Sequence, residues 1–304
     1  MLVNLFRFKE LNMCLRKLSI VDDTLKMLGI AKEYRRLYNL AIRLIIGWIV
    51  LICLLTVSDN FTSKCNYFTN CIIVPLMGKY LLYVNTFNGI IWGTILRYIG
   101  SKFQQINKCV HNMLEDKKGH VKKLQKLILI QQRTEAKERK QLIWIIMHVH
   151  LELVQISRIW NKVFSVQMTL QMTSYFALMI STCLDFYTAY IMKKKREHTV
   201  IKQFLNILNV YFWAVLCNAN LLTLNYSCQS VCDETKKTVT MLHKLSNDNF
   251  DKNLREQIVQ FILQIKQTEI KFSGMGTFHF GYKFIRQFYM SAATVIVFII
   301  QMRY

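Results

Sequence analysis

The sequence has few of the features that mark an enzyme or a metalloprotein. Its nine cysteines form no Cys-x-x-Cys pair. Cys228 and Cys232 are one helical turn apart, but the sequence has no second cysteine pair or nearby histidine that would complete a zinc site with them. His148 and His150 are two residues apart, which places them on different faces of a helix and disfavours a shared metal ion. The sequence shows no nucleophile elbow and no pair of acids in a defined setting. We therefore expect no enzyme, no cofactor and no metal site.

Acidic residues are also scarce, since 18 Asp and Glu stand against 40 Lys and Arg, for a formal net charge of +22. In a soluble protein this excess would indicate nucleic-acid binding. Here the basic residues flank apolar blocks in a chain that is 53% hydrophobic, as membrane insertion requires. We therefore expect contacts with membrane lipids and none with nucleic acid. The N-terminus lacks a long apolar core with a small-residue cleavage site, so no signal peptide is expected.

The apolar blocks predict five membrane-spanning helices, each near the length of about 20 residues that a bilayer requires. They cover residues 40–57, 80–99, 166–192, 204–226 and 284–302. The third and fourth blocks carry many polar side chains, which cannot face lipid cheaply and should face other helices or a water-filled cavity. The expected fold class is an all-α, polytopic membrane helical bundle with long cytoplasmic helix extensions.

This pattern divides the chain into six segments. They are a cytoplasmic N-terminal segment (1–39), two transmembrane helices with a short outer loop at 58–70 (40–99), cytoplasmic helical extensions (100–165), two transmembrane helices with polar faces (166–226), cytoplasmic anchor helices (227–283) and a final transmembrane helix (284–304). The larger basic segments then lie on one side of the membrane. The basic run 193–197 does not fit this arrangement. Spans that cross the membrane in alternating directions place it outside, whereas its positive charge favours the inside.

Local patterns add four expectations. Residues that share one helix face, in a segment too charged to span, should form a packing face: Leu254, Ile258, Phe261, Ile262 and Ile265. Gly119 is the expected break in the helical segment 100–140. Asn60 opens a glycosylation sequon in the outer loop. Cys65 and Cys71 flank that loop and could form a disulfide bond if it is extracellular, with free thiols as the alternative.

Three elements of the sequence resemble those of the insect gustatory receptors, which are relatives of the insect odorant receptors. The last apolar block has Thr294-Val295, five apolar residues and Gln301-Met302, where the family has Thr-Tyr, five apolar residues and Gln-Phe. Upstream, FSGMGTFHF resembles the family's Gly-x-Phe element. His150, Leu153, Asn161 and Phe164 resemble the His, Leu and Asn-x-x-Phe residues that the family has where its fifth helix begins. The three elements occur in order within residues 141–304.

The resemblance implies seven transmembrane helices, of which the five predicted spans match the third to the seventh. The segment 1–39 matches the cytoplasmic segment before the third helix of the family. The first two helices are therefore expected to be absent from this chain. A natural short form, a faulty gene model and a decaying gene are the alternatives that the sequence leaves open.

The resemblance also implies a ligand-gated cation channel of four subunits, with the last helix lining the pore. Thr294, Phe298, Gln301 and Met302 would then be pore residues, with the last two at the narrow outer gate. The alternative is that Gln301 simply meets lipid headgroups. By position, the ligand-pocket candidates are Ser181, Asp185, Tyr187, Tyr190, Asn206, Asn209, Tyr211 and Trp213. Hydrogen bonds between helices are the alternative role for each of them.

The expected function is a taste receptor in the plasma membrane. Sugar-sensing members carry an acid directly after the Thr-Tyr pair, where this chain has Ile296, so a bitter or orphan ligand is expected. The expected partners are a small-molecule tastant, membrane lipids and other gustatory receptor subunits in a homo- or hetero-tetramer. A non-conducting partner subunit and a truncated, non-functional receptor are the alternatives. A G-protein-coupled receptor is disfavoured by five spans and an external C-terminus.

Overall fold

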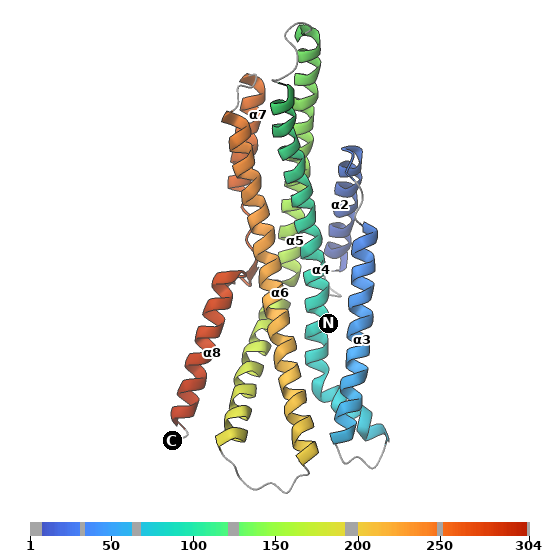
Figure 1. Ribbon diagram of the computed structural model, residues 1–304, viewed down its shortest axis with the longest axis vertical. Coiled ribbons are helices and arrows are strands. Elements are labelled where there is room, and N and C mark those ends of the chain that lie inside the picture. The colour runs from blue at the N-terminus through green and yellow to red at the C-terminus, as the bar shows by residue number, and fades with distance from the viewer. Residues whose placement is uncertain are drawn as a thin grey trace. The chain divides into compact units, whose positions relative to one another are not determined.

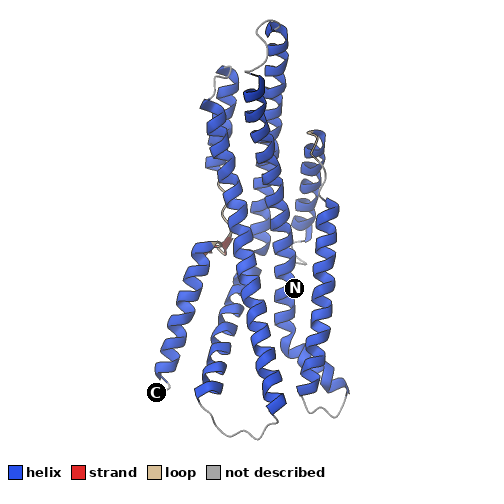
Figure 2. Cartoon of the chain, viewed as in Figure 1, coloured by secondary structure: helices blue, strands red, loops and turns tan. Residues whose placement is uncertain are grey.

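The computed structural model describes residues 8–30, 34–62, 68–120, 128–191, 200–247 and 252–302. Over these ranges the chain forms seven helices and one two-stranded sheet (Figure 1). The elements are α2 (Phe8–Met27), α3 (Tyr34–Thr62), α4 (Phe68–His120), α5 (Ile128–Ile191), α6 (Val200–Asn247), α7 (Lys252–Gln267), β1 (Ser273–Gly274), β2 (Phe278–His279) and α8 (Tyr282–Met302). Figure 2 shows how completely helix dominates. The all-α prediction is confirmed, and the short hairpin is an addition to it.

Three of the helices are far longer than a bilayer is thick. α4, α5 and α6 have 53, 64 and 48 residues, against about 20 for one crossing. Neither α5 nor α6 contains proline or glycine, so nothing interrupts the backbone hydrogen bonds of these helices. Gly119 is still part of α4, whose described residues end at His120, and residues 121–127 lie outside the described ranges, so the break predicted at Gly119 stays a prediction.

The predicted outer loop, residues 58–70, is longer than the gap between helices in the structure. α3 continues to Thr62 and α4 already begins at Phe68. Residues 58–62 contain neither proline nor glycine, which are the usual signals that end a helix. Asn60 therefore lies in the last turn of α3 and not in a loop. Cys65 lies outside the described residues.

Three helices in the described part of the chain are long and apolar enough to cross a membrane. They are Tyr38–Val57, Lys137–Leu184 and Tyr282–Met302, and each overlaps one predicted span. The predicted spans 80–99 and 204–226 are helical parts of α4 and α6 but are not among these three. Both contain several asparagines, which make them less apolar. Their crossing of the membrane stays a prediction, and the run 193–197 lies outside the described residues.

The chain divides into two compact units. Unit 1 comprises Met1–Lys32, Leu96–Ser165 and Cys228–Ser273, and unit 2 comprises Glu33–Ile95, Val166–Ser227 and Gly274–Tyr304. The long helices α4, α5 and α6 each contribute residues to both units. The candidate spans Tyr38–Val57 and Tyr282–Met302 belong to unit 2. The sides of the membrane assigned to the six sequence segments stay predictions.

The core of unit 1 includes the face of α7 that its sequence predicts. The buried residues of this helix are Leu254, Ile258, Phe261, Ile262 and Ile265, which confirms the predicted packing face. An apolar stripe at these spacings has to be covered by neighbouring helices. Phe103 of α4 and Leu153 of α5 are among the other fully buried side chains of this unit.

Unit 1 also buries an ion pair between α2 and α4. The Lys102 ammonium lies 2.8 Å from an Asp22 carboxylate oxygen, and the two side chains are 2% and 10% exposed. The Tyr98 hydroxyl donates a hydrogen bond to the same carboxylate. The Lys102 ammonium also lies 4.8 Å from the centre of the Tyr98 ring, a cation–π distance. Asp22 therefore has both a positive charge and a hydrogen-bond donor close to it.

A second buried polar group in unit 1 connects α4 with α6. The Asn107 amide donates hydrogen bonds to the Glu234 carboxylate at 2.9 Å and to its carbonyl oxygen at 3.0 Å. The Thr238 hydroxyl donates to the Asn107 side-chain oxygen at 2.6 Å. A buried polar network in which every member has a partner fixes the register of the helices that carry it.

The segment between α7 and α8 forms a tight hairpin. Met275 and Gly276 have φ values of 50° and 76°, and the Thr277 N–H donates to the Gly274 carbonyl at 3.0 Å. Two consecutive positive φ values give the mirror-image turn that matches the twist of a hairpin. A Cβ added at Gly274 would lie 2.4 Å from Phe278 Cζ and 2.7 Å from Thr169 Oγ1. Glycine is therefore required at this position for lack of space.

We expect Gly274→Ala to lower the free energy of unfolding by about 1–3 kcal/mol, the usual effect of overpacking. The Phe278 ring cannot move aside easily, because its centroid lies 4.6 Å from that of Phe284 and 5.2 Å from that of Phe280. Thermal unfolding of the detergent-solubilised chain measures the change. Gly47→Ala is the matched control, since an added Cβ there has nothing within 4 Å. Equal stability of the two variants would contradict the close contact.

Candidate functional site

In unit 2, polar side chains of α4 and α5 pair with one another. The Gln171 amide donates to the Asn85 carbonyl oxygen at 2.9 Å and to the Tyr175 hydroxyl at 2.6 Å. The Asn85 amide donates to the Ser174 hydroxyl at 3.0 Å. Gln171 is fully buried. These pairs give the Gln171 amide N–H group and the Ser174 hydroxyl of the third predicted span partners on a neighbouring turn or helix, as groups that cannot face lipid require.

The terminal helix α8 is attached to α5 and α6 through one side. Its buried residues are Phe284, Phe288 and Ala292. The Phe288 ring meets the Phe176 ring of α5 edge to face, with centroids 5.5 Å apart. The Tyr289 hydroxyl donates a 2.6 Å hydrogen bond to the Asn218 side-chain oxygen of α6. These contacts couple the position of α8 to that of α6.

A further hydrogen bond holds the start of α8. The Gly281 N–H donates to the Asn225 side-chain oxygen at 2.9 Å, and Asn225 is fully buried in α6. Gly281 has a φ of 140°, which side chains rarely adopt. The Ile285 N–H donates back to the Gly281 carbonyl at 3.2 Å and closes the first turn of α8. The last helix therefore starts from a fixed point on α6.

A small cavity lies where α5, α6 and α8 meet. Tyr175, Thr182, Cys217, Asn218 and Phe288 are among the residues that line it. Its volume is about 10 Å³. That is about the space of one water molecule and far below the roughly 300–1,000 Å³ of sites for drug-sized ligands. A drug-sized ligand would therefore require these helices to separate.

The predicted pocket residues fall into different environments. Ser181 and Tyr211 are exposed, and Tyr187 is partly buried. Trp213 is 5% exposed and packs with Leu55 and Tyr83 in a hydrophobic cluster. The side chains of Asp185, Tyr190, Asn206 and Asn209 lie outside what the structure describes. None of the four described candidates lines the cavity between α5, α6 and α8.

Sequence reasoning missed Thr182, Cys217 and Asn218 as lining residues. Thr182 and Asn218 each make a hydrogen bond to a carbonyl one turn earlier in their own helix. Asn218 also accepts from Tyr289. A polar residue on an apolar helix was the available signal for Asn218, but sequence alone does not show which helix it faces.

The predicted pore residues lie on the exposed part of α8. Thr294, Phe298 and Gln301 follow at spacings of four and three, so they share one side of the helix, turned away from buried Ala292. Phe298 is 59% exposed and Met302 is 73% exposed. The Thr294 hydroxyl donates to the Met290 carbonyl of its own helix at 3.0 Å. Within one chain, this side of α8 is open to a partner, to lipid or to water.

The long helices, the apolar spans and the paired polar groups define an all-α, polytopic membrane protein. The model of the 7tm chemosensory receptor family matches residues 1–304, so the chain belongs to that family. It is therefore a membrane chemoreceptor, and the family recognised from three sequence elements is confirmed. No curated protein matches the chain.

The hydrogen bond between α8 and α6 gives a direct prediction. We expect Tyr289→Phe to destabilise the chain by about 0.5–1.5 kcal/mol, the usual net contribution of one hydrogen bond. The change removes only the hydroxyl and leaves the Asn218 oxygen without this donor. Thermal unfolding measures the effect. Tyr282→Phe on the same helix is the control, because Tyr282 is exposed and its hydroxyl makes no hydrogen bond to a described residue. A loss of the same size in the control would refute this role.

Proposed function

We propose that this chemoreceptor is an insect gustatory receptor subunit that forms a ligand-gated cation channel in the plasma membrane. Its ligands are bitter or other non-sugar small molecules, and it assembles as a homo- or hetero-tetramer with other gustatory receptor subunits. The family membership and the Thr294–Gln301 signature support this proposal.

The observation that carries the proposal is the two-sided character of α8. One side packs within unit 2 through Phe288 and Ala292, and the other side exposes Thr294, Phe298 and Gln301. Four such helices around an axis would place a ring of glutamine amides next to apolar rings. Amide oxygens can replace part of the hydration shell of a cation, and apolar rings close a pore by excluding water.

The contacts between α8 and α6 suggest how ligand binding opens the pore. Tyr289 bonds to Asn218, and Asn218 lines the small cavity between α5, α6 and α8. A tastant that enlarges this cavity would shift α6 and, through Tyr289, α8. Such a ligand opens the channel only if it binds the open state more tightly than the closed state.

The test is electrical recording from cells that express the full chain, alone and with candidate partner subunits. We expect bitter alkaloids to evoke a cation current and sugars to evoke none. Gln301→Ala should change the relative permeability of the current to sodium and potassium. Surface labelling of an extracellular tag controls for expression.

Two results would contradict the proposal. Silence in every combination despite good surface expression would exclude a channel subunit. The second result is a current, recorded with another receptor subunit present, that Gln301→Ala does not change. It would indicate that this chain is a non-conducting partner of that subunit.

A further inference from the structure

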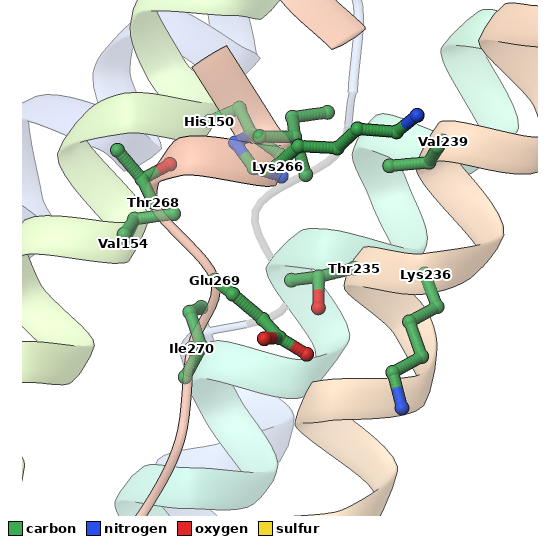
Figure 3. Close-up of a pocket in the computed structure, with 10 residues that line it drawn as sticks. His150, Val154, Thr235, Lys236, Val239, Lys266, Thr268, Glu269 and Ile270 are labelled. Atoms are coloured by element: carbon green, nitrogen blue, oxygen red, sulfur yellow. The ribbon is translucent and has the colours of Figure 1, made fainter. Parts of the chain in front are cut away.

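A second and much larger cavity lies in unit 1, between α5, α6, α7 and the segment that follows α7 (Figure 3). Its volume is about 280 Å³, well above the roughly 10–15 Å³ that one water requires and close to the lower end of ligand sites. The lining residues are His150, Val154, Thr235, Lys236, Val239, Ile265, Lys266, Thr268, Glu269 and Ile270. None of them is among the predicted pore or pocket residues.

The inner wall of this cavity carries an unsatisfied polar side chain. His150 is fully buried, and neither of its ring nitrogens has a hydrogen-bond partner among the described residues. Phe103 and Phe261 meet the imidazole edge to face, at 5.2 and 5.4 Å between centroids, and offer it no polar partner. A neutral imidazole presents one N–H donor and one acceptor. Since buried polar groups are nearly always paired, the missing partner is expected from the cavity that His150 lines.

Most of the other residues that line the cavity are apolar in its buried part or charged at its mouth. Val154, Ile265 and Ile270 are buried. Lys236, Lys266 and Glu269 are exposed. In Figure 3 the Lys266 side chain extends from α7 toward Val239 of α6, while the Glu269 side chain points toward Thr235. The cavity therefore offers apolar surface inside and charged groups where it opens.

The charge at the mouth is positive. The Glu269 carboxylate is 2.9 Å from the Lys271 ammonium, and this hydrogen bond lowers the pKa of Glu269, so its negative charge is already matched. Neither Lys236 nor Lys266 makes an ion pair with a described residue. The charge of Lys236 also acts on Glu269 and lowers its pKa, which leaves Lys266 as the lining lysine whose ammonium favours an anionic group at the mouth.

We propose that this cavity is a second small-molecule site that binds a carboxylic acid with a compact apolar body. The carboxylate lies at the mouth near Lys266, and the body lies against Val154, Val239 and Ile265. A polar atom of the body pairs with His150. The site lies wholly within unit 1, and its existence does not depend on the channel proposal.

Fluorine NMR on the full chain in phosphatidylcholine nanodiscs tests the site. The probe is 3-fluoro-4-hydroxybenzoate, whose ring hydroxyl can pair with His150, and the neutral comparison is 3-fluoro-4-hydroxybenzamide. We expect a saturable change of the fluorine signal with the acid and binding that is about fivefold weaker or worse with the amide, the effect of losing one exposed charge contact.

Variants then locate the binding. Lys266→Gln should weaken acid binding at least about fivefold and leave amide binding unchanged. Lys252→Gln is the matched control, since Lys252 is an exposed lysine of α7 that does not line the cavity. Val239→Trp should abolish acid binding by filling the cavity, and Val154→Phe does the same from α5 if the first variant fails to fold. His150→Phe keeps the aromatic packing and should weaken binding of both probes.

Three results would overturn the proposal. The first is that the parent chain shows no saturable change with the acid, as expected for a cavity that holds only water. The second is that the amide binds as tightly as the acid. The third is that a folded Val239→Trp or Val154→Phe variant binds the acid as the parent does, which would place the binding elsewhere.

Discussion

Lys102→Met is expected to lower the free energy of unfolding by about 3–5 kcal/mol, the usual cost of breaking a buried ion pair from one side. The change leaves the Asp22 carboxylate buried without its countercharge, while the Tyr98 hydroxyl still donates to it. Methionine fills a similar volume, so the loss reflects charge and not a cavity. Denaturant unfolding of the solubilised chain, followed by circular dichroism, measures the change.

The double variant Asp22→Asn with Lys102→Met separates charge from packing. Removing both charges should recover most of the lost stability, because the remaining asparagine can still accept from Tyr98. Lys108→Met is the control, since Lys108 is an exposed lysine of the same helix. If Lys102→Met unfolds like this control, or if the double variant is no more stable than Lys102→Met alone, the ion pair does not hold α2 against α4.

The ion pair shows why part of this fold was not predictable. In the sequence, Lys102 is one of many basic residues in the segment 100–140, and Asp22 lies in a separate helix far upstream. Side-chain periodicity shows which face of a helix is apolar, but it does not show which of several lysines is covered by another helix. Only the packing of α2 on α4 distinguishes Lys102 from exposed Lys108.

The sequence was most informative where one helix face is uniform. The buried face of α7 agrees with its prediction residue for residue, because apolar spacing in a charged segment has one interpretation. The hairpin after α7 was not predicted, although its two glycines could have indicated it. Its need for Gly274 comes from Phe278 of the hairpin itself and from Thr169 of α5, and only Thr169 is distant in the sequence.

The structure also gives physical roles to the residues that identified the family. Asn161 accepts a hydrogen bond from the Ser273 N–H at 3.1 Å and so fixes the start of the hairpin. Phe164 lies against the Trp160 ring at 4.4 Å between centroids. Leu153 is fully buried in unit 1. His150 is the exception, because it has packing partners but no polar partner within the described part of the chain. The ligand-pocket candidates, chosen by position only, gained no such support.

The role proposed for α8 leads to the second large effect. We expect a charged thiol reagent, applied from outside, to block most of the ligand-evoked current of Gln301→Cys. A residue that lines a narrow ring is reached by water, so its thiol can ionise and react, and the attached group then fills the ring. A thiol that faces lipid stays protonated and unreactive. Recording before and after the reagent measures the block, and Phe298→Cys replaces Gln301→Cys if the latter does not conduct.

The native cysteines and the remaining faces of the membrane helices supply the controls. Burial raises the pKa of Cys14 and Cys232 to about 11, so these thiols stay protonated at neutral pH. Cys53 is exposed, so the reagent is also applied to the parent chain, and the block of Gln301→Cys is measured against the current that the parent keeps. Ala292→Cys tests the buried side of α8, and Val50→Cys tests an exposed position of α3 that should face lipid. A current that survives the reagent in both Gln301→Cys and Phe298→Cys would mean that α8 is a lipid-facing anchor. In that case the conducting path would have to be formed by other helices.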